Sequence, residues 1–122
     1  NCPYWLNEGI AVNLTQNLSD NYLDQLDVAC KQNMLFCFDT LESGLPTNDT
    51  CVRRQVYAQC HTMIDYLTDS FGWPIVSEMV RKSATHSMDE ILAAAGLSYY
   101  LLESNWLAWL KNNCIKNRLQ TV

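Results

Sequence analysis

The sequence predicts an all-α fold. Apolar residues recur at helical spacing along nearly the whole chain, and the alternating Val, Ile and Thr runs that indicate strands are absent. The 122 residues, 48% of them hydrophobic, are the size of one domain with one core. We therefore expect residues 1–122 to form a single domain of about six helices.

The first two predicted helices precede residue 43. The first runs from Pro3 to Thr15, because proline is favoured at the opening position of a helix. Asp20 caps the second helix, whose apolar residues share one face. This face consists of Leu23, Leu26, Cys30, Met34 and Cys37.

A loop and a long third helix follow. Residues 43–50 contain Gly44 and Pro46, which interrupt helical periodicity. The third helix ends at Phe71, where Gly72 supplies a left-handed stop. Its apolar positions are Val52, Val56, Cys60, Met63, Ile64 and Leu67. We expect the second and third helices to form an antiparallel hairpin around the loop.

Three shorter helices complete the expected domain. Residues 74–82 form the fourth, with proline in its first turn. Ser87 and Glu90 have the spacing of a capping box for the fifth, which ends at Gly96. Ser98 begins the last helix. Its inward residues are Leu102, Trp106, Trp109 and Leu110.

The charge balance excludes two kinds of partner. The chain has 8 Lys and Arg against 13 Asp and Glu, a net charge of -5, and its basic residues are scattered. Nucleic acid and anionic membrane surfaces are therefore not expected partners. No apolar run approaches the ~20 residues that span a bilayer, and no signal-peptide pattern opens the chain. We expect a mature protein without a membrane span.

The cysteines predict an oxidising compartment. Their number, six, is even and high for this length, and the close pairs of a zinc ribbon are absent. In the expected hairpin Cys37 and Cys51 flank the loop, and Cys30 and Cys60 lie further out on each arm. The remaining pair would join the termini, Cys2 with Cys114. These pairs are one choice among the fifteen that six cysteines allow.

Glycosylation acceptors agree with export. Three Asn-x-Ser/Thr sequences begin at Asn13, Asn17 and Asn48. Together with the predicted disulfides, they favour a secreted glycoprotein.

One segment near the start of the chain carries a family resemblance. Residues 5–11, Trp-Leu-Asn-Glu-Gly-Ile-Ala, resemble the W-L-N-E-G-x-A segment of gluzincin metallopeptidases, which include peptidase-MA-like domains. The resemblance implies that Glu8 is the third protein ligand of a catalytic zinc, beside two histidines. From the residues alone, Glu8 is also an ordinary acidic residue in a first helical turn.

Two later segments extend the resemblance to about residues 4–111. Residues 57–73 contain Tyr57-Ala58-Gln59, a Tyr-Leu pair and Phe-Gly-Trp, and are similar to a second gluzincin segment. This similarity implies that Tyr57 stabilises the oxyanion of the tetrahedral intermediate, although a core tyrosine has the same helical spacing. Residues 87–110 are similar to the closing segment of peptidase-MA-like domains, which implies the C-terminal helical half of a gluzincin fold.

The catalytic His-Glu-x-x-His helix is missing from the sequence. In the family it lies roughly twenty residues before the zinc-binding glutamate, but only seven residues precede Glu8 here. The histidines, His61 and His86, do not replace it by spacing. A lone carboxylate holds zinc too weakly, so we expect neither a cofactor nor peptide hydrolysis in this chain as it stands. Zinc is expected only if another segment completes the site.

Three functions follow. We expect a secreted, catalytically incompetent domain that acts as a structural or binding module. An alternative is the C-terminal piece of a metallopeptidase whose zinc-binding helix lies on another or removed segment. A second alternative is a small carrier or toxin-like protein with a pocket in its interior. That interior would be lined by Met34, Phe36, Phe38, Met63 and Met79.

Loss of the zinc-binding helix predicts a protein partner. In the parent fold that helix covers the Glu8 helix, so its absence uncovers apolar residues, which are seldom left in water. These residues are Trp5, Leu6, Ile10 and Leu14. We expect a second copy, another subunit or a rearranged last helix to cover them. The most specific form of this prediction is self-assembly into an oligomer or filament.

Overall fold

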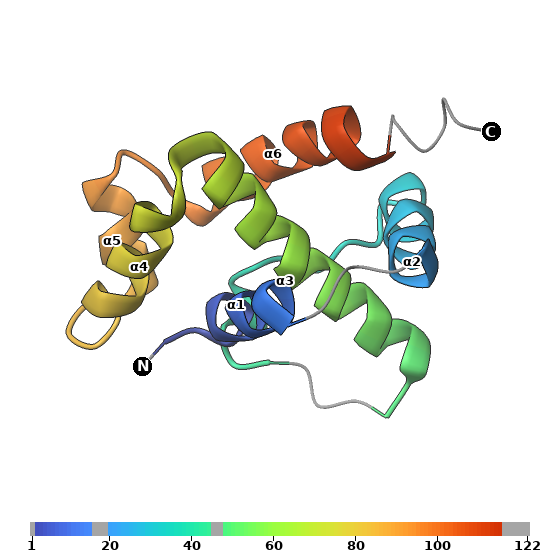
Figure 1. Cartoon of the computed structure of the whole chain (residues 1–122), viewed down its shortest axis with the longest axis horizontal. Helices are drawn as coiled ribbons and strands as arrows, with labels where there is room; N and C mark the ends of the chain where they lie inside the picture. Colours follow the sequence, from blue (N-terminus) through green and yellow to red (C-terminus); the bar gives the residue numbers. More distant parts are fainter. Residues whose placement is uncertain (1, 16–19, 45–47, 116–122) are drawn as a thin grey trace.

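The predicted all-α class is confirmed. The computed structural model describes residues 2–15, 20–44 and 48–115, and in these ranges it contains six α-helices and no strand (Figure 1). The helices are α1 (Tyr4–Thr15), α2 (Asp20–Lys31), α3 (Thr50–Phe71), α4 (Trp73–Lys82), α5 (Met88–Ala94) and α6 (Tyr99–Leu110). A 3₁₀ turn, η1 (Thr40–Glu42), precedes α3, and a short π-helix, η2 (Lys111–Ile115), follows α6.

The long helix α3 is the centre of the fold. It packs against α1, α2, α4 and α6, and α4 and α5 lie beside its C-terminal end (Figure 1). The Asp49 carboxylate caps its first turn by accepting hydrogen bonds from the backbone N–H groups of Cys51 and Val52. Gly72, with φ of 84°, ends it, as predicted. The predicted capping box of α5 also forms between Ser87 and Glu90.

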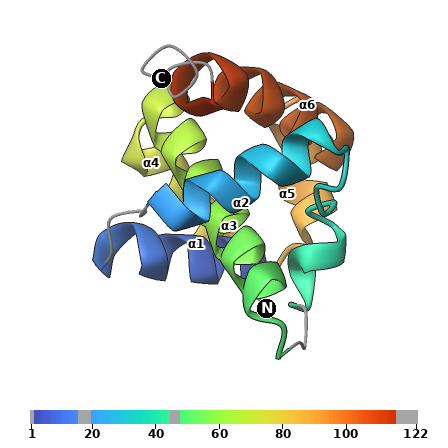
Figure 2. The same ribbon diagram turned by 90° about the vertical axis from the view of Figure 1, so that its right-hand side faces the viewer.

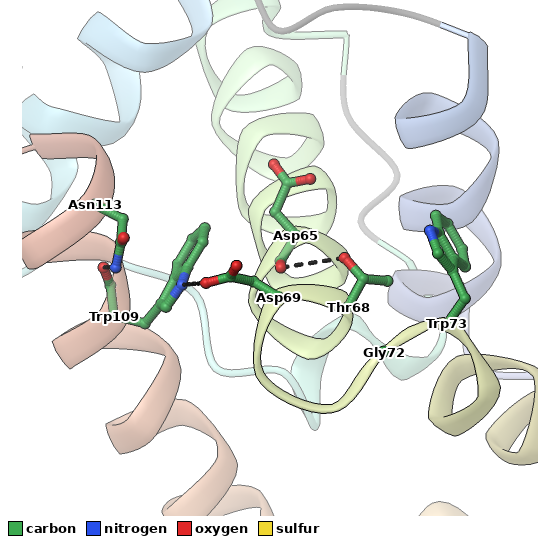
Figure 3. A pocket seen from close by; sticks show the side chains of 7 residues that line it. All are labelled: Asp65, Thr68, Asp69, Gly72, Trp73, Trp109 and Asn113. Carbon is green, nitrogen blue, oxygen red and sulfur yellow. Dashed lines mark hydrogen bonds between the residues drawn. The ribbon is translucent and has the colours of Figure 1, made fainter.

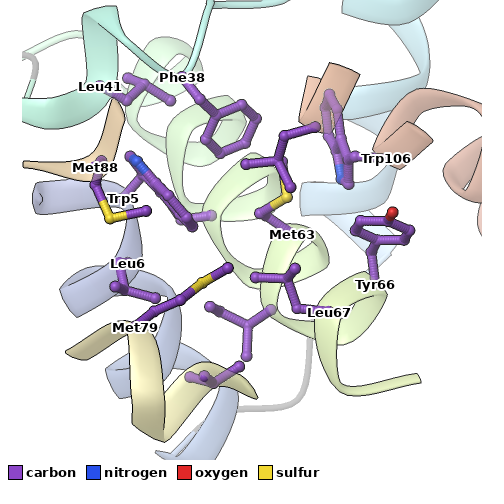
Figure 4. Packing of buried hydrophobic residues seen from close by; sticks show 14 of the residues in the cluster. Trp5, Leu6, Phe38, Leu41, Met63, Tyr66, Leu67, Met79, Met88 and Trp106 are labelled. Atoms are coloured by element: carbon purple, nitrogen blue, oxygen red, sulfur yellow. The ribbon is translucent and has the colours of Figure 1, made fainter. Parts of the chain in front are cut away.

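An aromatic row forms the middle of the core (Figure 4). Trp5 of α1 packs edge-to-face on Phe38, with ring centroids 5.4 Å apart, and Phe38 packs on Trp106 of α6 at 5.3 Å. Both indole N–H groups are satisfied, because Trp106 Nε1 donates to Thr62 Oγ1 and Trp5 Nε1 donates to the Tyr99 hydroxyl, each at 3.1 Å. The row ties the first and last helices to α3.

The predicted length of the second helix is wrong. α2 ends at Lys31, and Asn33 has a positive φ of 56°. Residues 34–37 are nonhelical because Gln59 of α3 satisfies the backbone of Phe36. The Gln59 Nε2 donates to the Phe36 carbonyl at 2.9 Å, and its Oε1 accepts from the Phe36 N–H at 3.0 Å. Met34, expected on an apolar helix face, is therefore 63% exposed.

The early end of α2 also removes the predicted hairpin. α2 crosses α3 instead of running back along it (Figure 2). Cys37 consequently lies near Glu103 of α6, and Cys60 of α3 is buried near Glu8 of α1.

No disulfide is formed among the described cysteines, so the structure does not support the description of the fold as disulfide-stapled. Cys30, Cys37, Cys51 and Cys60 are free thiols here, so the Cys37–Cys51 and Cys30–Cys60 pairs stay predictions. Cys2, expected to pair with Cys114, is also a free thiol in this structure. The Cys114 side chain lies outside the described part of the chain.

The buried face of α6 is largely as predicted. Leu102, Trp106 and Leu110 of α6 are buried as predicted, but Trp109 is only half-buried and borders a pocket.

Among the described helices, none has the length and apolar character needed to cross a bilayer.

Candidate functional site

Gly9 fixes the position of Glu8 against α3. A Cβ atom at Gly9 would lie 2.6 Å from the carbonyl oxygen of Cys60 and 2.7 Å from Cγ1 of Ile64. α1 therefore approaches the backbone of α3 so closely that only glycine fits there. This contact gives a physical reason for a glycine directly after Glu8, whose side chain is half-buried at the edge of the same interface.

Glu8 lies in a small cluster of ionisable side chains, which we call the Glu8 cluster: Tyr4, Glu8, Tyr57 and Cys60. The pKa of Tyr4 is raised to about 12, mainly by burial and in smaller part by the charges of Glu8, Cys60 and Tyr57. Burial also raises the pKa of Cys60 to about 12, with Glu8 as the second cause. Glu8 and Tyr57, the two residues implied by the family resemblance, thus both lie within electrostatic range of Tyr4.

The histidines do not join this cluster. His61 Nδ1 lies 3.1 Å from Oδ2 of Asp65, one helical turn further along α3. His86 Nδ1 lies 2.9 Å from the hydroxyl oxygen of Thr85, in the turn before α5. The residues described around Glu8 therefore supply one family zinc ligand beside two tyrosines and a buried thiol, with no histidine among them, and by themselves they do not fit a catalytic zinc.

Another group of possible metal ligands lies elsewhere. Among the described side chains, one ligand atom each from Cys37, Asp39 and Glu103 lie within 4.8 Å of one another. The Glu103 carboxylate accepts the Phe38 N–H, and the Asp39 carboxylate accepts the Thr40 N–H at 2.8 Å. Glu103, burial and Asp39 raise the pKa of the Cys37 thiol. Sequence reasoning missed this group because α6 follows Cys37 by more than sixty positions.

A pocket at the C-terminal end of α3 was also not predicted. It has a volume of about 500 Å³, and we call it the Trp–Asp pocket (Figure 3). Its lining residues are Asp65, Thr68, Asp69, Gly72, Trp73, Trp109 and Asn113. The Phe-Gly-Trp segment was a sequence signal for Trp73, but nothing in the sequence places Trp109 of α6 beside it.

Two of the predicted interface residues belong to the core. Trp5 and Leu6 are fully buried within the chain, and the cover over Trp5 includes Tyr99 of the last helix, α6, which is one of the three covers expected. Phe38 and Tyr99, the latter at the start of α6, both pack on Trp5 and cover it within the chain. Ile10 is half-buried, and Leu14 is 67% exposed.

The predicted glycosylation acceptors have different surroundings. Asn13 lies within α1, and its Nδ2 donates to Oδ1 of Asp65 at 2.7 Å. Asn48 is exposed just before α3. Asn17 lies outside the described residues. Of the two described acceptors, Asn48 is the more accessible.

A comparison with known families agrees with the resemblance carried by residues 5–11 and 57–73. The family model of the Peptidase MA superfamily matches residues 1–112. The chain therefore belongs to the Peptidase MA superfamily. Neither the curated proteins nor the solved structures gave a match to this chain.

Proposed function

We propose that this domain is a noncatalytic binding module of the Peptidase MA superfamily. It keeps the helical scaffold of the superfamily but, within these 122 residues, does not hold the catalytic zinc by itself. The observation that carries the proposal is the composition of the Glu8 cluster. Glu8 shares this cluster with Tyr4, Tyr57 and Cys60, whereas His61 lies against Asp65.

The physical reason is the protonation state of these neighbours. A thiol coordinates zinc as a thiolate, and burial raises the pKa of Cys60 to about 12, so zinc would have to displace a tightly held proton to bind there. Tyr4 has a similarly raised pKa of about 12. One carboxylate with protonated neighbours does not activate water for attack on a peptide bond.

A peptidase assay tests this proposal. The purified chain is incubated with a mixture of fluorescence-quenched peptides and added zinc, beside a Glu8→Ala variant and a sample with chelator. We expect no cleavage above the buffer background in any sample. Cleavage that the chelator stops and that Glu8→Ala abolishes would overturn the proposal.

A second function is favoured by the placement of Glu8 and Tyr57. Both residues lie near Tyr4, as expected for the zinc ligand and the oxyanion-stabilising phenol of one peptidase site. In this alternative a His-Glu-x-x-His segment outside residues 1–122 completes the site. The coding sequence before Asn1 tests it directly, because that motif would lie roughly twenty residues before Glu8.

Self-association is not part of the proposal. Its basis was an uncovered patch that included Trp5 and Leu6, and both side chains are fully buried within the domain. Secretion remains a prediction that rests on the cysteine count and on the glycosylation acceptors.

A further inference from the structure

The Trp–Asp pocket has two aromatic sides and an acidic floor. Trp73, at the start of α4, and Trp109, near the end of α6, lie on either side of Asp65 and Asp69 of α3 (Figure 3). Trp73 is 41% exposed. The volume of about 500 Å³ is large enough for an amino-acid side chain and part of its backbone. None of the seven lining residues is Lys or Arg.

Hydrogen bonds hold the acidic residues and one indole in place. Asp69 Oδ2 accepts the Trp109 Nε1–H at 2.8 Å, and the Trp109 carbonyl accepts a hydrogen bond from Asn113 Nδ2 at 2.9 Å. The Asn13 amide donates to Asp65 Oδ1 at 2.7 Å, and His61 Nδ1 lies 3.1 Å from Asp65 Oδ2. The pocket is therefore preformed, which reduces the entropy lost when a ligand binds.

The polar groups of the lining favour a cation over a sugar. A sugar needs hydrogen-bond donors as well as acceptors, but three donors of the lining are already used. Trp109 donates to Asp69, the Thr68 hydroxyl donates to the Ile64 carbonyl at 2.9 Å, and Asn113 donates to Trp109. The carboxylates remain as acceptors, and aromatic faces attract cations.

We propose that the Trp–Asp pocket binds an arginine side chain of a protein partner. This inference rests on the proposed binding function and names the partner chemistry. A guanidinium is flat, stacks on an indole and donates two parallel hydrogen bonds to a carboxylate, whereas a lysine ammonium is compact and strongly hydrated. The net charge of -5 also favours a basic partner.

Calorimetric titration of the full chain with two hexapeptides tests the proposal. The peptides are identical except that one carries arginine and the other its neutral isostere, citrulline. We expect the arginine peptide to bind at least about tenfold more tightly, because the charged hydrogen bonds are lost with citrulline. Its affinity should also fall as salt is raised, because salt screens exposed charges.

Two substitutions locate the site. Asp69→Asn keeps an oxygen for the Trp109 N–H but removes the charge, and Trp73→Ala removes one exposed aromatic side. Each should weaken arginine-peptide binding about tenfold. The matched controls are Asp89→Asn and Tyr100→Ala, which change an exposed acid and an exposed aromatic outside the pocket. Both controls should leave the affinity within about twofold of the parent chain.

Several results would overturn the arginine site. These are no arginine-peptide binding at millimolar concentration, equal binding of both peptides, or equal losses in the control variants. Preferential binding of a soluble oligosaccharide would assign the pocket to sugars instead. Circular dichroism confirms that each variant is folded. The peptidase assay does not use this pocket, so failure here leaves the proposed noncatalytic function standing.

Discussion

At the residue scale, Gly9 shows how one position couples the fold to the candidate site. Because Gly9 has no side chain, α1 approaches the backbone of α3 closely, and this approach places the adjacent residue Glu8 near Cys60. The contact at Gly9 involves a carbonyl oxygen, which cannot swing aside as a side chain can. Packing and site geometry therefore depend on the same residue.

Replacing Gly9 with alanine should destabilise the domain. Alanine gains about 1 kcal/mol of helix propensity, but overpacking against α3 costs typically 1–3 kcal/mol or more. Because the closest atom belongs to the backbone, we expect a net loss of about 1–2 kcal/mol in the free energy of unfolding, measured with urea. The control is Asn7→Ala on the exposed face of α1. A stability gain in Gly9→Ala would contradict the close approach.

Cys60 should make the domain less stable at alkaline pH. Its pKa is about 12 when folded and 9.0 ordinarily, so the folded chain retains the thiol proton more tightly. This contribution is fully present below pH 9.0 and is lost as pH rises toward about 12. Tyr4, raised from 10.0 to about 12, acts in the same direction at higher pH.

Urea unfolding at pH 8 and pH 10.5 tests the Cys60 contribution. The free energy of unfolding of the parent chain should fall by roughly 2 kcal/mol between these pH values through Cys60, since each pKa unit corresponds to about 1.4 kcal/mol. Cys60→Ala should lose correspondingly less, and Cys51→Ala, at an exposed cysteine, should behave like the parent. Equal pH dependence in the parent and Cys60→Ala would show that Cys60 is not buried as described.

At the scale of elements, local signals predicted helix boundaries well. Gly72 and the Ser87–Glu90 pair act through atoms within a few residues, so their effect is visible in the sequence. α2 ends at a local signal, because Asn33 has a positive φ and the Met34 N–H donates to the Ala29 carbonyl at 2.8 Å. The helical spacing that continued through Met34 and Cys37 hid this signal. The nonhelical path of Phe36 depends also on Gln59, which is 23 positions away and could not be read locally.

Gln59 should control the order of residues 34–38. Gln59→Ala leaves the N–H and carbonyl of Phe36 without their partner, a loss of about 1–3 kcal/mol. Amide hydrogen exchange at Phe36 should accelerate, while exchange in the middle of α3 should change only as much as global stability does. Arg53→Ala, at an exposed position of the same helix, is the control. Unchanged exchange at Phe36 would contradict the proposed role of Gln59.

At the scale of the whole molecule, the sequence predicts Glu8 as a candidate site residue, but the Trp–Asp pocket and part of the cover over Trp5 could not be predicted from it. The Trp-Leu-Asn-Glu-Gly-Ile-Ala segment is enough to single out Glu8 and to indicate the superfamily, which the family match confirms. The Trp–Asp pocket could not be predicted, since it forms only where α3, α4 and α6 meet. A cover from the last helix, where Tyr99 lies, was among the expectations for Trp5, but the contribution of Phe38 was not predictable, because it reaches Trp5 from a distant segment.

The central claim is that Glu8, without two histidines, does not retain zinc in this domain. Zinc bound per chain, measured by elemental analysis after dialysis of the zinc-loaded protein against metal-free buffer, tests it most directly. The account predicts far less than one zinc per chain, with no difference between the parent and Glu8→Ala. One zinc per chain in the parent, lost in Glu8→Ala, would contradict the account.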